Sequence, residues 1–152
     1  MKSKIPTAVP KITVRNLQRK MPVDVVDLEK FARKAVELCL GVPRTKNTDL
    51  MQLREISVLI VSDRRIASLN RQFLNEGGPT DVITFQHGEI LISAETARHH
   101  ARRFGNLLAR ELSLYVVHGL LHLHGFDDRS EVEARKMEAA QRKIFEKAAA
   151  GS

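Results

Sequence analysis

Apolar and polar residues follow two periods along the chain, and each period predicts a different kind of element. Residues 11–16 alternate apolar with polar side chains, and residues 54–62 form a β-branched run; both patterns are typical of strands. Two more short apolar runs, residues 81–85 and 89–93, are separated by only three residues, which suits a hairpin. The pattern therefore predicts four strands.

Elsewhere the apolar residues recur at the spacing of three or four that marks one face of a helix. Helices are expected over residues 23–40, 63–75, 94–105, 106–124 and 128–150. Val26 is expected to share the apolar face of the first helix with Phe31, and Val132 is expected in the apolar stripe of the last. Asp63 has the position and the chemistry of an N-cap.

Strands and helices are mixed along the chain, without a repeat, a low-complexity tract or an interdomain linker. This order indicates a single α+β domain over residues 11–148, between short tails at residues 1–10 and 149–152. A length of 152 residues supports one hydrophobic core and is short for two.

Composition narrows the class of protein. No apolar run approaches the roughly 20 residues that span a bilayer, and the basic N-terminus lacks the apolar stretch of a secretory signal. We therefore expect neither a membrane segment nor export. The single cysteine, Cys39, cannot form an internal disulfide, which fits a reducing cytoplasm, and it is expected to fill the core.

The net charge of +7 is concentrated in residues 1–50, where eleven Lys and Arg outnumber five Asp and Glu. A basic surface attracts polyanions such as RNA by neutralising their phosphates. The same charges can also serve only to keep a protein soluble. Charge alone leaves both interpretations open.

The candidate chemistry lies in the stretch HGLLHLHGFDD, residues 118–128. His118 and His122 are one helical turn apart and share a face, as the two histidines of HExxH zinc sites do. A turn at Gly125 can bring Asp127 or Asp128 back toward them, and two histidines with one carboxylate form an established catalytic zinc set. The alternative is a pair of buried, hydrogen-bonded histidines.

Two further residues of this stretch limit the interpretation. His124 lies about 200° around the helix from His122, so we expect it to be solvent-facing or at the helix C-terminus, where the helix dipole favours a cation. Gly119 occupies the position at which HExxH proteases carry their glutamate base, which argues against a protease of that type.

Residues 118–128 resemble the signature HGxLHLxGYDH of the YbeY family of bacterial endoribonucleases. Upstream, LNRQF (69–73) and PTDVITF (79–85) resemble the family pattern LNxxFRxxDxPTDVLSF, and GEILI (88–92) resembles its GDIVI strand. The motifs occur in the same order and at matching spacing, and the resemblance extends over residues 11–148.

The resemblance implies a compact α+β fold, with a mostly four-stranded sheet, about five helices and a zincin-like metal helix. It implies a zinc-dependent, single-strand-specific endoribonuclease in 16S rRNA 3′-end maturation and ribosome quality control, located in the cytoplasm. The implied partners are ribosomal RNA and the small ribosomal subunit, with a small-subunit ribosomal protein and an Era-type GTPase.

Carried over residue by residue, the resemblance makes His118 and His122 the first two ligands of one Zn²⁺ per chain. The third ligand of the family is usually histidine, and that position is Asp128 here. A carboxylate binds zinc at a similar distance, but its charge makes a bound water less acidic and favours harder ions. Another divalent ion is therefore an alternative to zinc.

The upstream motif departs from the family pattern, since Leu74 and Gly77 replace its arginine and aspartate. Arg71 can take the place of that arginine in RNA binding and catalysis, or it can be a solvated surface residue. Thr80 and Asp81 are expected to line the cleft as substrate-binding residues, or else to satisfy backbone donors where the strand begins.

His87 is a candidate proton carrier or substrate contact, or a surface loop histidine. The nucleophile, either a metal-bound water or the RNA 2′-OH, stays open. Two other functions are also compatible with the chain: a ribosome-assembly factor with weakened catalysis, and a metal-dependent hydrolase of a substrate other than RNA.

Overall fold

The computed structural model describes residues 9–69 and 81–150. Its sheet has the strand order β1-β2-β4-β3. The strands are β1 (Lys11–Asn16), β2 (Glu55–Val61), β3 (Val82–Phe85) and β4 (Glu89–Ser93). The pairs β1–β2 and β2–β4 are parallel, and β3 pairs antiparallel with β4, which confirms the predicted hairpin.

The described residues contain six helices, where about five were expected. They are α1 (Val25–Leu40), α2 (Asp49–Gln52), α3 (Asp63–Leu69), α4 (Ala94–Phe104), α5 (Leu108–Leu123) and α6 (Glu131–Ala150). The additional helix is α2, a single turn capped by Thr48, which is too short to show a period in the sequence. These elements confirm the predicted α+β class.

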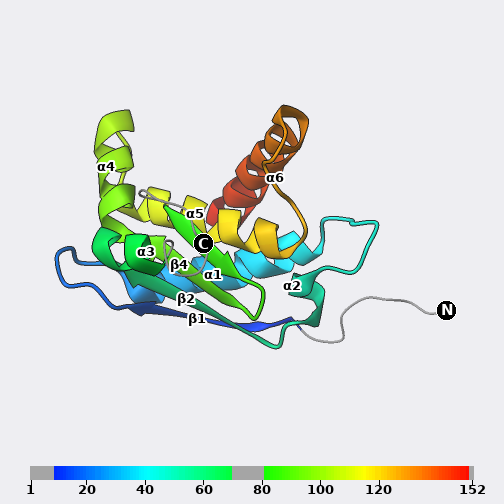
Figure 1. Cartoon of the computed structure of the whole chain (residues 1–152), viewed down its shortest axis with the longest axis horizontal. Coiled ribbons are helices and arrows are strands. Elements are labelled where there is room, and N and C mark those ends of the chain that lie inside the picture. The colour runs from blue at the N-terminus through cyan, green and yellow to red at the C-terminus, as the bar shows by residue number, and fades with distance from the viewer. Residues whose placement is uncertain (1–8, 70–80, 151–152) are drawn as a thin grey trace.

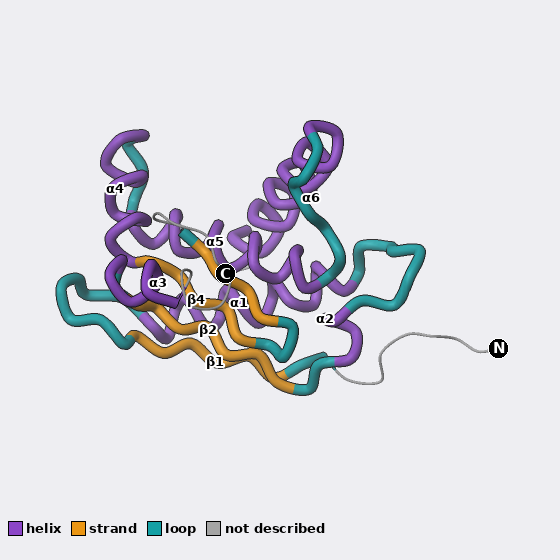
Figure 2. The backbone as a smooth tube through the Cα atoms, in the orientation of Figure 1, coloured by secondary structure: helices purple, strands orange, loops and turns teal. Residues whose placement is uncertain are grey.

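The sheet separates two apolar clusters because its side chains alternate between faces. Ile90 and Ile92 of β4 face the main core with α1 and α5, whereas Leu91 faces a smaller cluster with Ile66 of α3. Figure 1 shows α4 and α6 projecting on the same side of the molecule, with α5 running between their bases. Figure 2 shows the same arrangement, with the helices in purple and the strands in orange.

Cys39 lies in the core with no exposed surface, as expected, and burial raises the pKa of its thiol to about 12. Two expected core positions are wrong, since Val26 is 65% exposed and Val132 is 60% exposed. Each lies five residues before a buried residue of its helix, Phe31 or Met137, and five residues correspond to about 140° of rotation.

The expected N-cap at Asp63 is also wrong. Ser62 occupies that position, and its hydroxyl accepts a hydrogen bond from the backbone N–H of Arg65 at 3.2 Å. The Asp63 carboxylate instead accepts hydrogen bonds from the hydroxyls of Ser93 and Thr96, which tie α3 to the start of α4. Over residues 9–69 and 81–150, no helix is both long and apolar enough to cross a membrane.

Candidate metal centre

Helix α5 and the loop that follows it bring three potential metal ligands together. His118 and His122 lie one turn apart, and their Nε2 atoms are 3.1 Å from each other. Asp128 completes the group, with one ligand atom from each residue within 4.8 Å of the others. Asp127 is not part of this group; its carboxylate accepts a hydrogen bond from the backbone N–H of Arg129 at 3.1 Å. The structure therefore brings together the three residues that the sequence singled out as ligands.

The outer nitrogen of each imidazole is held by an oxygen that accepts hydrogen bonds. His122 Nδ1 lies 3.0 Å from the carbonyl oxygen of Phe126, and His118 Nδ1 lies 3.0 Å from Oε1 of Gln141 on α6. Both Nδ1 atoms therefore carry a hydrogen, and in the neutral rings both Nε2 atoms present lone pairs. The two Nε2 atoms thus lie together beside Asp128.

Two lone pairs at this separation repel each other unless a cation lies between them. A proton is disfavoured, because burial and the neighbouring His118 lower the pKa of His122 despite the opposing charge of Asp128. Tetrahedral zinc with bonds of 2.0–2.1 Å places two nitrogen ligands about 3.3–3.4 Å apart. The observed separation of 3.1 Å is close to that value, so the group can hold a metal ion.

Two glycines position α5 and the ligand loop. A Cβ on Gly119 would lie 2.7 Å from Cγ2 of Ile90, so this glycine lets α5 approach β4 closely. Gly125 has a left-handed backbone, with φ of 88°, and ends the helix. The guanidinium of Arg44 holds the turn that follows, since its Nη2 donates to the Gly125 carbonyl at 3.0 Å and its Cζ lies 4.0 Å from the centre of the Phe126 ring.

His124 is the C-cap of α5, as one of the two expectations had it, but it is not solvent-facing. Its side chain is fully buried, with Nδ1 at 2.9 Å from the Thr48 hydroxyl and Nε2 at 2.8 Å from the Val42 carbonyl. Burial lowers its pKa, so the expected role as a cation at the helix terminus is also wrong. His124 anchors the end of α5 to the segment between α1 and α2.

Asp81, at the start of β3, lies close to the N-terminal half of α5. Its backbone carbonyl accepts from Ser93 N–H at 3.0 Å. Burial is the main cause that raises the pKa of Tyr115 on α5, and the charges of Asp81 and Glu111 add to it. The Tyr115 hydroxyl lies 2.8 Å from Nδ1 of His100 on α4. Asp81 thus lies beside the polar row of α5, which is formed by Glu111, Tyr115 and His118 on one face of the helix.

His87 lies apart from the three ligands, in the turn between β3 and β4. It is exposed, its Nε2 is 3.1 Å from the Glu89 carboxylate, and its ring stacks on Phe85 at 5.6 Å. Phe85 belongs to the smaller apolar cluster, which lies on the opposite face of the sheet from α5. Arg71 and Thr80, like Leu74 and Gly77, lie outside the described residues. The roles of His87, Arg71 and Thr80 remain predictions.

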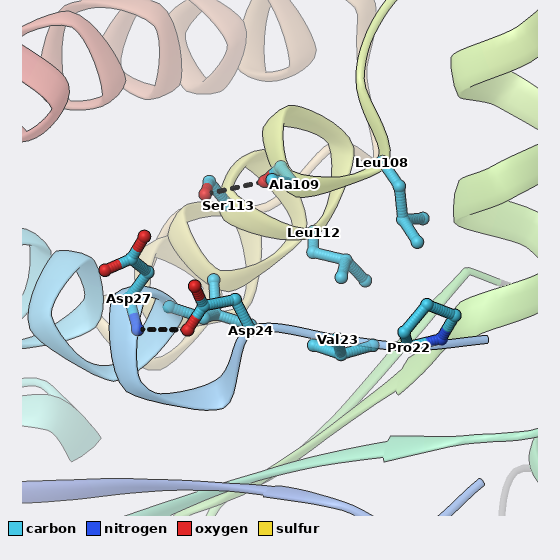
Figure 3. Close-up of a pocket in the computed structure, with 9 residues that line it drawn as sticks. Pro22, Val23, Asp24, Asp27, Leu108, Ala109, Leu112 and Ser113 are labelled. Atoms are coloured by element: carbon cyan, nitrogen blue, oxygen red, sulfur yellow. Dashed lines mark hydrogen bonds between the residues drawn. The ribbon is translucent and has the colours of Figure 1, made fainter. Parts of the chain in front are cut away.

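A separate pocket of about 280 Å³ lies where the segment before α1 meets the first turns of α5 (Figure 3). Its walls are mostly apolar, and two of its polar side chains, Asp24 and Ser113, have structural partners. The Asp24 carboxylate caps α1 by accepting from Asp27 N–H at 3.0 Å, and the Ser113 hydroxyl donates to the Ala109 carbonyl at 2.8 Å. None of the three potential ligands lines this pocket.

Sequence reasoning missed the groups that hold the histidines. Gln141 follows His118 by 23 residues, and the Phe126 carbonyl carries no side-chain signal. Arg44 precedes Gly125 by 81 residues. Only the packing of α6 and of the α1–α2 segment against α5 brings Gln141 and Arg44 to the site, so no local pattern could have indicated these two residues.

Comparisons of the sequence and of the fold with known proteins identify the family of this chain. The family model described as Endoribonuclease YbeY matches residues 13–149. Curated proteins named Endoribonuclease YbeY from Geobacter metallireducens and Geobacter sulfurreducens are each 35% identical over 150 residues, covering 89% of this chain and 93% of their own. The solution structure of a Thermotoga maritima protein matches with a TM-score of 0.61 at 28% identity, covering 90% of this chain and 88% of that one. The chain belongs to the YbeY endoribonuclease family.

Proposed function

We propose that this chain is a metal-dependent endoribonuclease that cleaves single-stranded RNA, with Zn²⁺ held by His118, His122 and Asp128. Membership of the YbeY family carries the coarser statement, an endoribonuclease that acts in rRNA processing. The finer proposal is that it matures the 3′ end of 16S rRNA and acts in ribosome quality control. The observation that supports the metal chemistry is the pair of Nε2 atoms 3.1 Å apart beside the Asp128 carboxylate.

The side chains and backbone around the site orient the two imidazoles and provide the ligands for a metal ion. Gln141 and the Phe126 carbonyl fix the rotation of the two imidazoles, so that both Nε2 atoms face the same position before a metal arrives. Asp128 is exposed on its loop and can swing to complete the set. A divalent ion bound there would supply Lewis-acid stabilisation of phosphate charge and a more acidic bound water.

Two residues are proposed as contacts of the substrate near this centre. Asp81 lies beside the polar row of α5, where it can accept hydrogen bonds from ribose hydroxyls. Arg71 is proposed to stabilise phosphate charge in place of the arginine that Leu74 replaces. Whether a water or the RNA 2′-OH attacks is decided by the product ends, because attack by the 2′-OH leaves a 2′,3′-cyclic phosphate.

The proposed partners follow from this role. They are ribosomal RNA in the small subunit, together with a small-subunit ribosomal protein and an Era-type GTPase, and the proposed location is the cytoplasm. Co-sedimentation with 30S particles tests the first of these, and a protein without catalysis that still co-sediments would instead be an assembly factor.

The decisive experiment combines metal content with RNA cleavage. Purified protein is expected to contain about one divalent ion per chain and to cleave a single-stranded oligoribonucleotide. His118→Ala and Asp128→Ala should lose metal and activity together, whereas the neighbouring carboxylate variant Asp127→Ala should keep both. Cleavage that survives both ligand substitutions would refute the metal-centred proposal.

The identity of the metal has its own test. Asp128→His restores the ligand type usual in the family, and it is expected to raise the preference for Zn²⁺ over harder ions such as Mn²⁺. If the natural protein already prefers Zn²⁺ by the same factor as this variant, Asp128 does not set the metal preference of the site. Metal-dependent hydrolysis of a small phosphodiester without RNA cleavage would point to a different substrate class.

A further inference from the structure

We infer that the exposed face of α4, with the Phe104 ring at its end, forms a binding surface for single-stranded RNA beside the candidate metal centre. This inference rests on the proposed function and names a second contact region for its substrate. Helix α4 carries three arginines and two histidines but one glutamate. It projects from the molecule on the same side as α6, with α5 between them (Figures 1 and 2).

The positive charge of α4 is open to solvent. Arg98, Arg102 and Arg103 are all exposed, and within the described ranges none of them forms an ion pair. The one acidic side chain, Glu95, is already engaged by Lys20 Nζ at 3.1 Å and by the Asp63 backbone N–H at 2.9 Å.

The helix dipole accounts for only part of this charge. It favours cations in the last turn of a helix, which holds Arg102 and Arg103, whereas Arg98 lies before that turn. Arg98 and Arg102 are four residues apart and therefore lie on one outward face of α4. Two adjacent exposed guanidinium groups on one face match successive phosphates of a nucleic acid backbone.

A row of aromatic rings leads from the exposed end of α4 to α5. Phe104 is 65% exposed, a large fraction for a phenylalanine. Its ring centre lies 6.4 Å from that of His100, which in turn lies 6.5 Å from that of Tyr115. The hydrogen bond of 2.8 Å between His100 Nδ1 and the Tyr115 hydroxyl fixes this row in place.

The row ends close to the candidate metal centre. Tyr115 precedes His118 by three residues on the same helix, a rise of about 4.5 Å along its axis. Residues spaced by three, four and seven share a face of a helix, so Tyr115, His118 and His122 follow one ridge of α5. A strand bound along α4 is thereby directed toward the three potential ligands.

The combination of charge and aromatic rings selects single-stranded RNA as the occupant. Proteins that bind single strands pair a positively charged surface with aromatic side chains on which unpaired bases stack. A duplex hides the faces of its bases, and it would leave the exposed Phe104 ring without a function. An acidic protein surface would use the arginines but would not need an exposed ring.

The test measures binding separately from cleavage. Metal-free protein in EDTA is titrated into a fluorescent single-stranded oligoribonucleotide of mixed sequence at several salt concentrations. Arg98→Gln with Arg102→Gln is compared with Lys11→Gln and Arg15→Gln, which remove the same charge. This control pair is exposed on β1, the edge strand at the far end of the sheet from β3.

The α4 double variant is expected to reduce the slope of log K against log salt by about 1.4, or about 0.7 for each lost phosphate contact. This slope corresponds to roughly 25-fold weaker binding at 0.1 M salt if the two lines meet near 1 M. The β1 double variant should leave the slope within experimental error. Equal losses in the two pairs would mean a general charge effect and would overturn the inference.

Phe104 gives an independent readout. Phe104→Ala is expected to weaken binding by roughly 5- to 150-fold, the range for losing one stacked base, and Phe104→Tyr should restore it. Unchanged affinity in Phe104→Ala would overturn the stacking role. Failure of the metal-loaded natural protein to cleave the oligonucleotide would refute the proposed function instead, while normal cleavage with unaltered binding in the α4 variants would refute only this inference.

Discussion

Replacement of His124 tests the interpretation of this buried histidine as an anchor for the end of α5. The Val42 carbonyl can only accept a hydrogen bond, so His124 Nε2 carries the hydrogen and Nδ1 accepts from the Thr48 hydroxyl. His124→Leu fills the same space with an apolar side chain, but the Thr48 hydroxyl and the Val42 carbonyl lose their hydrogen-bond partner. Each buried, unpaired polar group costs about 1–3 kcal/mol.

The sum for the two groups is about 2–6 kcal/mol. Val42 is only half-buried, so water can reach its carbonyl, and the expected loss in the free energy of unfolding is therefore about 2–4 kcal/mol. Thr48→Val removes the donor and also the cap of α2, whose Met51 N–H lies 3.4 Å from the Thr48 hydroxyl. The double variant should lose less than the sum of the single losses, because both remove the same hydrogen bond.

The pH dependence has a defined sign. Burial lowers the pKa of His124 in the folded protein below its ordinary value near 6.5. Below that pH the unfolded chain binds a proton that the folded protein excludes, so stability falls as the pH drops from 6.5 through the folded pKa. His122, whose pKa is also lowered, contributes a loss of the same sign that remains in His124→Leu.

The assay is urea unfolding of metal-free protein at pH 8 and at pH 5.5, followed by circular dichroism. Natural protein should lose stability at the lower pH, and His124→Leu should lose less between the two values. A variant that costs under about 0.5 kcal/mol at pH 8, or that keeps the full acid sensitivity, would refute the anchoring role. Such a result would mean that water satisfies Val42 and Thr48 without cost.

Three other outcomes are expected. Gly119→Ala should lower the free energy of unfolding by up to about 2 kcal/mol, because overpacking against Ile90 costs about 1–3 kcal/mol and the gain in helix propensity is roughly 1 kcal/mol. Chemical denaturation should show a smaller loss when the same change is made in an Ile90→Ala background. Gln141→Ala should weaken metal binding about 10- to 100-fold by freeing His118, as measured by competition with a chelating dye, while its unfolding curve without metal stays close to that of the natural protein. Cys39, with a pKa raised to about 12, should resist a thiol reagent at pH 8 until urea unfolds the chain; fast labelling of the native protein would contradict its burial.

Local patterns predicted the four strands, five of the six described helices and the ligand pair. Alternation and short apolar runs located the strands, and a spacing of four placed His118 and His122 on one helical face, because these patterns depend only on local backbone geometry. The family resemblance then pointed to Asp128 rather than Asp127 as the third ligand. The edges of the apolar faces were less certain, and Val26 and Val132 show that a period does not reveal where the core ends.

The groups around His124 and His118 follow from how distant segments pack against α5. The environment of a side chain depends on segments distant in sequence, and Thr48 and Val42 turned His124 from an expected surface cation into a buried, neutral anchor. In the same way Gln141 of α6 fixed the rotation of the His118 ring. Such contacts form when helices pack, and their partners leave no period or motif in the chain.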